Sequence, residues 1–380
     1  MDKILIKELV AEDVVSELKK IGFDNGYASI ASEKFQYKNL KICNLTVAQA
    51  NIIKQTALTV GADLATNKDV VTGKIELSDA ILCGSISQIK KIAEKLKKQP
   101  FGLKTAALHI EELINEPVKK TKLVGILNVT PDSFSDGGKF INSQDACNHI
   151  IQLINDGADM IDIGAESSRP FSQPVEPDEQ ISRLKVVLEF IQKENIKTPV
   201  SVDTRSSEVA DFALNNGVCI INDVSGLEYD KKMTDIISKY NAGVIIQHTK
   251  GTPDIMQNSP FYTDVTEEVY KSLKSKKEYA ESLGINNIIL DPGIGFGKQM
   301  EDNFILINRA KEFFSLNKPI MFGVSRKSFL GVQENNNEIK DILTGVISYP
   351  MMKIGVDYLR VHNVKLHKMI LKNLLNFNKV

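Results

Sequence analysis

The sequence predicts an α/β fold, namely a (β/α)8 TIM barrel over residues 121–380 preceded by a small α/β or α+β N-terminal domain over residues 1–118. Eight short runs rich in Val and Ile alternate with longer amphipathic stretches from Leu123 onward, a pattern typical of strand-helix units around a parallel sheet. Eight units in about 250 residues match the size of such a barrel. A polar residue stands at or near the carboxyl end of every run, on what would be the catalytic face.

The eight runs define the predicted strands. In chain order they are LVGILNV from Leu123, MIDIG from Met160, PVSVD from Pro199, CIINDV from Cys219, GVIIQH from Gly243, NIILDP from Asn287, PIMFGVS from Pro319 and YLRVHNV from Tyr358. The polar residues at or near their ends are Asn128, Asp162, Asp203, Asn222, His248, Asp291, Ser325 and Arg360. For any one of them, polarity that resumes where a strand ends explains the residue as well as function does. Eight in succession indicate a binding site at the barrel mouth.

The N-terminal residues follow a different pattern. Lys-rich helical stretches such as SQIKKIAEKLKKQP alternate with brief apolar runs such as AILCGS, up to the polar connector INEPVKKTK that contains Pro117. The lysine run is typical of a solvated helix face, and this part of the chain has no catalytic motif. The sequence therefore predicts a separate small domain without indicating its role.

Composition excludes several classes of protein. The 380 residues are 42% hydrophobic and 25% charged with a formal net charge of -1, and nothing near 18 consecutive apolar residues occurs, so we expect a folded, cytoplasmic protein that does not act at a membrane. The four cysteines form no C-x-x-C pair, which favours reduced thiols. With no Trp and no basic tract, a nucleic-acid groove is not expected, and small molecules are the expected partners.

The most specific segments are two loops after the first two strands. NVTPDSFSDGG runs from Asn128 to Gly138, and GAESSRPFSQP runs from Gly164 to Pro174. Two loops rich in Gly, Ser and Pro over one barrel mouth suggest a lid that excludes water during a reaction.

The first of these loops and five further motifs resemble the dihydropteroate synthases, a family of pterin-binding (β/α)8 barrels. The six motifs are NVTPDSFSDGG, SVDTR, INDVSG, DPGIGFGK, GVSRKSF and RVH, in this order. The resemblance covers residues 121–380. It implies a transferase of folate biosynthesis that joins p-aminobenzoate to 7,8-dihydropterin-6-ylmethyl diphosphate, giving 7,8-dihydropteroate and pyrophosphate. It also implies a homodimer formed through outer barrel helices, and sulfonamides, which imitate p-aminobenzoate, should compete.

Four residues are predicted to bind the pterin. Its aminopyrimidinone edge offers two parallel N–H donors, which a carboxylate accepts as it accepts an Arg side chain. Asp291 matches the family's pterin-binding Asp and is the natural acceptor, while a turn cap before Pro292 is the alternative. Asp203 would hold another part of the ring, Asn222 would donate and accept at once, and Lys327 would approach the ring carbonyl.

Two residues of RVH are predicted to bind the diphosphate, because Arg360 and His362 occupy alternate positions of one strand and thus the same side. Arg forks phosphate oxygens well. Asn128 has a hard carbonyl oxygen suited to a Mg²⁺ ion that bridges to the diphosphate. His248 and His362 lack zinc-site spacing, and His248 is more simply explained as a core histidine.

The predicted mechanism is a dissociative displacement. Pyrophosphate leaves readily, and the electron-rich dihydropterin stabilises a cation at the departing methylene. Mg²⁺, Arg360 and His362 would offset the charge on pyrophosphate, and with Asn128 and Lys327 these are the predicted catalytic residues. The neutral amine of p-aminobenzoate then attacks without a strong general base.

The p-aminobenzoate pocket is predicted from the loops and from GVSRKSF. That motif is expected to end the seventh strand and open a helix, so Ser328 and nearby backbone N–H groups would receive the carboxylate. DPGIGFGK lacks the spacing of a phosphate loop, and its Phe296 would form part of the pocket wall. By family likeness the loop residues that complete the pocket are Phe134, Ser168, Arg169 and Pro170, although Ser168 is also explained as an ordinary loop hydroxyl.

Some positions differ from the commonest family pattern, and two rival functions stay open. The differing residues are Ala165, Ser168, Phe171, Gln247 and Asn363. One rival is methyl transfer between a folate and a corrinoid protein, which would not need NVTPDSFSDGG, SSRP or SRKSF. The other is a pterin-binding paralogue without catalysis, which would bind the diphosphate substrate but release no pyrophosphate.

Overall fold

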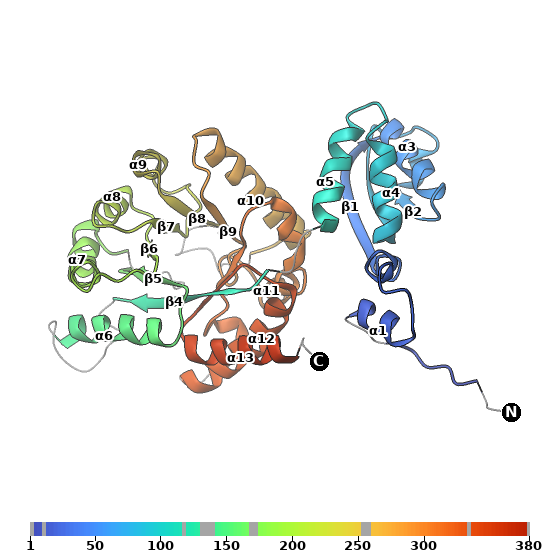
Figure 1. Ribbon diagram of the computed structural model, residues 1–380. Helices are drawn as coiled ribbons and strands as arrows, with labels where there is room; N and C mark the ends of the chain where they lie inside the picture. The colour runs from blue at the N-terminus through green and yellow to red at the C-terminus, as the bar shows by residue number, and fades with distance from the viewer. Residues whose placement is uncertain are drawn as a thin grey trace. The chain divides into compact units, whose positions relative to one another are not determined.

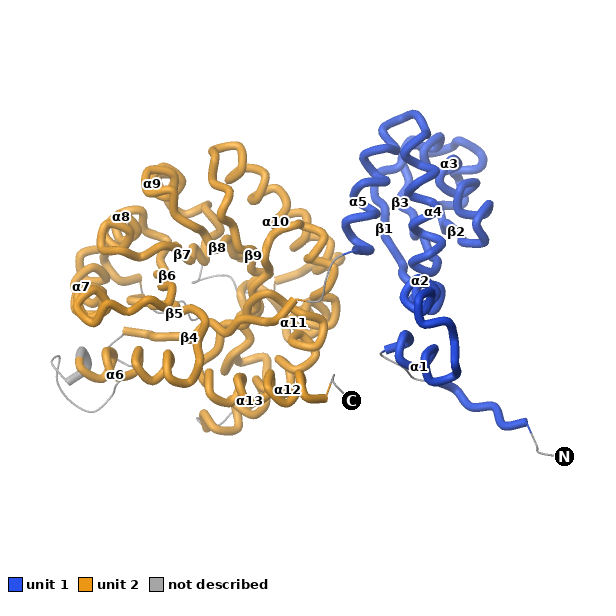
Figure 2. The backbone as a smooth tube through the Cα atoms, in the orientation of Figure 1, with its two compact units in different colours: residues 1–117 blue, residues 118–380 orange. Residues whose placement is uncertain are grey.

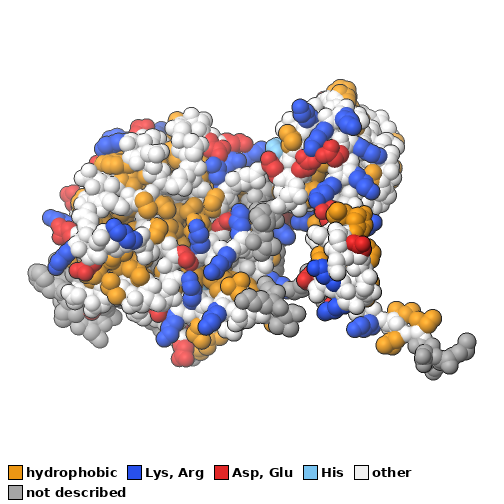
Figure 3. Space-filling model, in the orientation of Figure 1, with side chains coloured by type: hydrophobic (Ala, Val, Ile, Leu, Met, Phe, Trp, Pro, Cys, Tyr) orange, Lys and Arg blue, Asp and Glu red, His pale blue; other side chains and the backbone are white. Residues whose placement is uncertain are grey.

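The chain forms two compact units, residues 1–117 and 118–380, in the computed structural model (Figure 2). The structure describes residues 4–9, 13–115, 119–129, 141–166, 174–251, 260–332 and 336–377. Each unit has its own hydrophobic core. Basic and acidic side chains are interspersed on the face drawn in Figure 3. Among the described helices, none has the length and apolarity needed to cross a membrane.

The N-terminal unit contains a three-stranded antiparallel sheet in the order β1-β3-β2. Its elements are α1 (Val14–Lys20), α2 (Ala28–Ser32), β1 (Tyr37–Thr46), α3 (Val47–Leu58), β2 (Asp63–Thr66), η1 (Lys68–Val70), β3 (Leu77–Ser85), α4 (Ile86–Leu96) and α5 (Leu103–Asn115). Both α3 and α4 begin with a capping box, in which Thr46 and Ser85 pair with the Gln three residues later. Leu64 and Leu82 of the sheet are buried in the same core as Ile89 of α4. This unit is α+β, one of the two predicted classes.

The second unit contains an eight-stranded parallel sheet in the order β10-β11-β4-β5-β6-β7-β8-β9. Its strands are β4 (Lys122–Asn128), β5 (Met160–Gly164), β6 (Val200–Asp203), β7 (Ile220–Asp223), β8 (Gly243–Gln247), β9 (Ile288–Asp291), β10 (Met321–Phe322) and β11 (Tyr358–Val361). A parallel bridge between Leu290 and Ile320 joins the two ends of the sheet. The predicted (β/α)8 TIM barrel is therefore confirmed.

Helices follow the strands and surround the sheet (Figure 1). They are α6 (Ile141–Asn155), α7 (Pro177–Lys193), α8 (Ser207–Asn215), α9 (Met233–Tyr240), α10 (Val265–Ser282), α11 (Met300–Asn308), α12 (Asn337–Ile354) and α13 (Val364–Phe377), with the shorter turns η3 (Ala310–Leu316) and η4 (Ser328–Leu330). This arrangement covers the outer face of the parallel sheet, as such sheets require.

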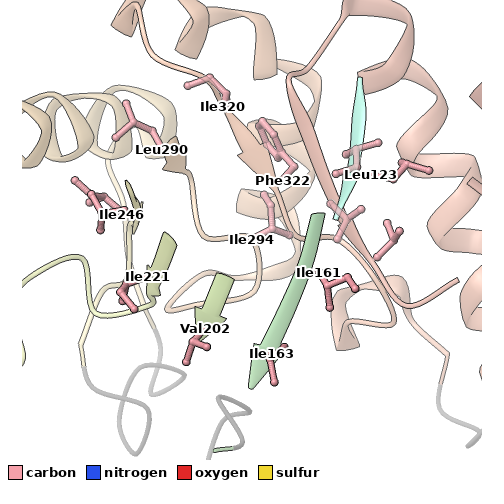
Figure 4. Close-up of a cluster of buried hydrophobic side chains, with 14 of the residues drawn as sticks. Leu123, Ile161, Ile163, Val202, Ile221, Ile246, Leu290, Ile294, Ile320 and Phe322 are labelled. Carbon is pink, nitrogen blue, oxygen red and sulfur yellow. The ribbon is translucent and has the colours of Figure 1, made fainter. Parts of the chain in front are cut away.

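Side chains alternate between the two faces of each barrel strand. Those that pack toward the helices include Ile161, Val202 and Ile246 (Figure 4). A separate layer, Val124, Met160, Ile245, Ile289 and Met321, packs together as a second cluster of buried side chains. Further along the strands the positions in phase with this layer become polar, so the alternation itself carries polar side chains to the carboxyl ends of the sheet.

The seventh predicted strand is shorter than expected. The prediction covered residues 319–325, but only Met321 and Phe322 form the ladder with β11. Arg326 follows with a left-handed φ of 56°, and its guanidinium forks onto the carboxylate of Asp341 at 2.7 and 2.9 Å. This turn carries the chain out of the sheet before Lys327.

Candidate active site

The predicted ligand-binding residues converge at the carboxyl ends of the strands. Gly323 lies at the centre of one group, because a Cβ built there would lie 3.8 Å from Lys327 Nζ, 3.9 Å from Asp291 Oδ2 and 4.0 Å from Arg360 Cβ. Asp203 joins this group by accepting a 3.0 Å hydrogen bond from Arg360 Nη2. Side chains from β6, β9, β11 and the turn after β10 thus surround one site. The absence of a side chain at Gly323 leaves room between them.

Asp162 belongs to the same network, although it was not among the predicted site residues. Its Oδ2 accepts hydrogen bonds from Arg360 Nε at 2.6 Å and from Asn222 Nδ2 at 3.0 Å. Its Oδ1 accepts a 2.6 Å bond from Ser201 Oγ. The signal available in the sequence was its position at the end of the second strand, in phase with the other polar ends.

The turn after β9 is held together by a buried lysine. Lys298 Nζ donates to the carbonyls of Gly293 at 2.8 Å and Phe296 at 3.0 Å, and lies 3.0 Å from His248 Nδ1. Gly293 has φ +69°, and a Cβ there would lie 1.9 Å from the His248 carbonyl oxygen, so only glycine fits. DPGIGFGK is therefore a tightly packed turn whose lysine binds its own backbone.

This turn also positions Lys327 and Phe296. Lys327 Nζ donates to the Ile294 carbonyl and lies 4.4 Å from the centroid of the Phe296 ring. Asp291 Oδ1 accepts a 2.7 Å hydrogen bond from the Gly293 N–H, so the turn cap that was the alternative interpretation of Asp291 is present. Asp291 Oδ2 is the oxygen that lies near Gly323.

Burial changes the proton affinities of the charged side chains in the site. It raises the pKa of Asp203 to about 7, although the Arg360 guanidinium lowers that pKa. It also raises the pKa of Asp291, against the effect of Lys327, and lowers the pKa of Lys327 to about 8, against the effect of Asp291. Shifts of this kind in one cluster are typical of a functional site.

His248 behaves as the expected core histidine. It is buried, and burial together with Lys298 lowers the pKa of His248 to about 2. Its imidazole is therefore neutral, and its Nδ1 accepts a hydrogen bond from Lys298.

The two remaining predicted diphosphate contacts, His362 and Asn128, are half-buried. His362 Nδ1 lies 2.9 Å from Ser325 Oγ, which also accepts the His362 backbone N–H at 3.1 Å. A Cβ on Gly164 would lie 3.3 Å from Asn128 Oδ1 and 3.8 Å from Asp203 Cβ, so Asn128 and Asp203 approach the same point. These contacts orient the His362 ring and place the Asn128 oxygen beside the acidic part of the site.

The predicted p-aminobenzoate pocket is only partly visible. Phe134, Ser168, Arg169 and Pro170 lie outside the described residues, as does Phe171. Ser328 is exposed at the start of η4, a 3-10 turn of three residues. The expectation that GVSRKSF opens a helix was wrong in extent, because Gly331 adopts a left-handed φ of 74° directly after Leu330 and ends the turn.

Comparison with known proteins identifies the family. Residues 124–362 match the model of the pterin-binding enzymes. The chain belongs to the pterin-binding enzyme family. It is 33% identical over 378 residues to the bifunctional dihydropteroate synthase/dihydropteroate reductase of Helicobacter pylori, covering 97% of this chain and 98% of that protein.

Two solved structures resemble the barrel of this pterin-binding enzyme. One is the dihydropteroate synthase of Clostridium difficile in the presence of pteroic acid, with 38% identity, a TM-score of 0.64, and coverage of 69% of this chain and 98% of that one. The other is the Yersinia pestis dihydropteroate synthase with a sulfonamide drug, with 31% identity, a TM-score of 0.64, and coverage of 70% and 97%. Those chains are therefore matched nearly whole by about two thirds of this one.

Two residues that differ from the common family pattern form defined contacts in this pterin-binding enzyme. Gln247 Nε2 donates to Thr249 Oγ1 at 3.1 Å and Asn363 Nδ2 donates to Asp341 Oδ2 at 3.0 Å. The second contact adds to the fork of Arg326 on Asp341 and so supports the turn that carries Lys327.

Proposed function

We propose that this pterin-binding enzyme is a dihydropteroate synthase, which joins p-aminobenzoate to the methylene carbon of 7,8-dihydropterin-6-ylmethyl diphosphate and releases pyrophosphate. The observation that carries the proposal is the convergence of three acceptors, Asp203, Asn222 and Asp291, with the donor Lys327. A dihydropterin is flat, has several N–H donors and one ring carbonyl, and is complementary to that set.

The chain's residues would act on the leaving group by electrostatics. Arg360 would approach the diphosphate from β11. His362 was predicted to lie on the same strand but follows its last residue, Val361, and is oriented by Ser325. Asn128 would hold a Mg²⁺ ion through its amide oxygen, a hard donor that lies near the same point as Asp203. When bound, Mg²⁺ would neutralise charge on the phosphate oxygens. Donors aimed at a departing anion stabilise the transition state of a dissociative displacement.

The amine of p-aminobenzoate must be held in position, but it does not need a strong base to activate it. Phe296 would form one wall of the p-aminobenzoate pocket, and Ser328 with the loop residues predicted above would complete it. Holding the neutral amine against the methylene makes its attack effectively unimolecular. The proton can leave after the C–N bond forms, so no protein nucleophile is required.

The direct test is pyrophosphate release by the full chain. We expect release that requires both the dihydropterin diphosphate and p-aminobenzoate, is lost when Mg²⁺ is chelated, and is inhibited competitively by a sulfonamide against p-aminobenzoate. Binding of the dihydropterin diphosphate in a calorimeter without any pyrophosphate release would instead support the paralogue without catalysis. Methyl transfer from a folate to a corrinoid protein would support the other rival.

The activity should have a bell-shaped pH profile. Asp203 must be ionised for both of its oxygens to accept N–H donors, and its pKa is about 7. Lys327 must be protonated to donate, and its pKa is about 8. Because kcat/KM reports the free enzyme, its value for the dihydropterin diphosphate should fall below the first pKa and above the second. Asp203→Asn should remove the acid limb, and a flat profile across both values would contradict the assignment.

The match to Helicobacter pylori extends the proposal to a second activity. That relative, whose name includes dihydropteroate reductase, is matched over 98% of its length by 97% of this chain, so it has a counterpart of the N-terminal unit. We expect the full chain to oxidise a reduced nicotinamide or flavin when given 7,8-dihydropteroate. A hydride would pass to the pterin ring, which takes a proton from water and becomes the tetrahydropterin. A chain that begins at Lys119 should lose this reduction but keep pyrophosphate release. The remaining release shows that the shortened chain is folded. Reduction by the shortened chain, or none by the full chain, would contradict the second activity.

The same enzyme is proposed to be a homodimer through α12 and α13. These helices expose Ile342, Val346, Met369 and Phe377, and Tyr349 with Leu366 and Leu374 lines a groove between them. Apolar patches of this kind mark protein interfaces. Light scattering should show a dimer for the natural chain and a monomer for Val346→Glu. Val186 is an exposed valine on α7, so Val186→Glu is the matched control and should stay dimeric. A dimer in both variants would contradict this interface.

A further inference from the structure

We infer that Asp162 is a positioning residue of the pterin site, which turns the oxygen of the Asn222 amide toward the ligand and holds the Arg360 guanidinium in place. The inference rests on the function proposed above and adds to it a residue that was not predicted to touch any substrate. Asp162 lies on β5 at the level of Ser201 on β6, two positions before the level of Gly164 and Asp203. It therefore lies beneath the residues that would contact a ligand.

Both carboxylate oxygens of Asp162 accept hydrogen bonds. The side chain is fully buried, Ser201 Oγ occupies Oδ1 at 2.6 Å, and Arg360 Nε and Asn222 Nδ2 share Oδ2 at 2.6 and 3.0 Å. A buried charge is tolerated when it is paired and fully hydrogen-bonded. Three different strands thus meet at one carboxylate.

This contact decides which way the Asn222 amide points. Asp162 Oδ2 accepts from Asn222 Nδ2 at 3.0 Å, so the NH₂ group of Asn222 faces Asp162 and the amide oxygen faces away. Among the described residues, Asn222 Oδ1 is buried and has no hydrogen-bond partner. A buried acceptor without a donor is costly, and a ligand N–H is the group that would satisfy it. Asp162 therefore makes Asn222 an acceptor for the dihydropterin.

The same carboxylate restrains Arg360. Asp162 binds Nε, and Asp203 binds Nη2 at 3.0 Å, so two carboxylates hold two different nitrogens of the planar guanidinium. The guanidinium cannot turn without breaking one of these contacts. Its remaining N–H groups keep a constant direction, which is what recognition of a diphosphate requires.

The test compares three variants of the full chain by steady-state kinetics. Asp162→Asn should raise KM for the dihydropterin diphosphate by about 10-fold to 100-fold, the effect expected when a hydrogen bond to a charged group is lost. Its KM for p-aminobenzoate should stay within about twofold, because that substrate binds elsewhere. Ser201→Ala, which keeps the carboxylate, should raise the first KM by about threefold to tenfold, as expected when one neutral hydrogen bond to it is removed. The control Asp159→Asn removes a carboxylate that accepts the Leu123 N–H at 2.9 Å just before β5, and should leave both KM values unchanged.

A double-mutant cycle separates positioning from a merely structural role. In an Asn222→Ala background, Asp162→Asn should raise KM for the dihydropterin diphosphate by a smaller factor than in the natural chain. The reason is that its effect through Asn222 is already lost. The inference would be overturned if Asp162→Asn raised this KM by the same factor in both chains. It would also be overturned if that variant raised the KM values for both substrates equally and lowered the melting temperature. If Asp162→Asn does not fold, Ser201→Ala decides, and an unchanged KM in that variant overturns it.

Failure of the proposed function is distinguishable from failure of this inference. If the natural chain releases no pyrophosphate, the synthase assignment fails. Calorimetry with 6-hydroxymethyl-7,8-dihydropterin then measures the same variants without catalysis. Weaker binding by Asp162→Asn than by Asp159→Asn supports the positioning role, and equal binding overturns it.

Discussion

Replacing Lys327 with Ala is expected to lower kcat/KM for the dihydropterin diphosphate by about a thousandfold, the upper effect seen when one preorganised donor is removed from an active site. Lys327 Nζ lies among the Ile294 carbonyl, the Phe296 ring and the carboxylate of Asp291. The variant would lose the donor proposed for the ring carbonyl and the cation that acts most strongly on Asp291. It also releases one contact that holds the turn after β9.

The control for this prediction is Lys277→Ala. Lys277 Nζ also donates to a backbone carbonyl, that of Leu316 at 3.3 Å, but it lies on the outer helix α10. We expect this variant to keep the natural kcat/KM. A natural rate for Lys327→Ala, measured as pyrophosphate release, would remove Lys327 from the site.

Replacing Lys298 with Met is expected to lower the free energy of unfolding of the barrel by about 3 kcal/mol, the order expected when buried acceptors lose a shared donor. Met has a similar length and fills the space, but the carbonyls of Gly293 and Phe296 and the ring of His248 would lose their common partner. Burial places the pKa of Lys298 well below its usual value, against the effect of Asp291. Burying the amine therefore costs stability, and the predicted loss requires that the three lost hydrogen bonds outweigh the relief of that cost.

Urea denaturation measures this effect, provided that a probe within the barrel is followed, because the N-terminal unit has its own core. Lys277→Met is the matched control and should change the unfolding free energy by less than about 1 kcal/mol, as surface substitutions do. A Lys298→Met chain as stable as the natural one would show that the turn after β9 does not depend on this lysine.

Much of the barrel could be predicted because each strand carries its own local pattern. MIDIG was predicted over the residues that β5 occupies, and β7 lies within the predicted CIINDV run. β11 ends at Val361, three residues before the end of the predicted YLRVHNV run. A larger departure is β10, where PIMFGVS is as apolar as the other runs but only two residues form the ladder. Its end is decided by Arg326 and Asp341, which are 15 residues apart, and no local pattern contains that contact.

The site was predictable as a set of strand ends but not as a network. The predicted Asp203, Asn222, Asp291, Lys327 and Arg360 are brought together by the fold. The supporting roles of Asp162 and Lys298 were not predicted. Asp162 is 198 residues from Arg360 in the chain and Lys298 is 50 residues from His248, so neither contact leaves a signal in sequence spacing.

The sequence by itself determined the fold class, the positions of the strands and the chemical types of the residues at their ends, because alternation and turn composition act over a few neighbouring residues. Only the tertiary structure decided which of those ends share a hydrogen bond, which way the Asn222 amide points and that Lys298 donates to the backbone of its own turn. Those outcomes depend on the pairing of the last strand, β11, with the first strand of the barrel, β4, because this pairing lets one arginine reach the acids of β5 and β6.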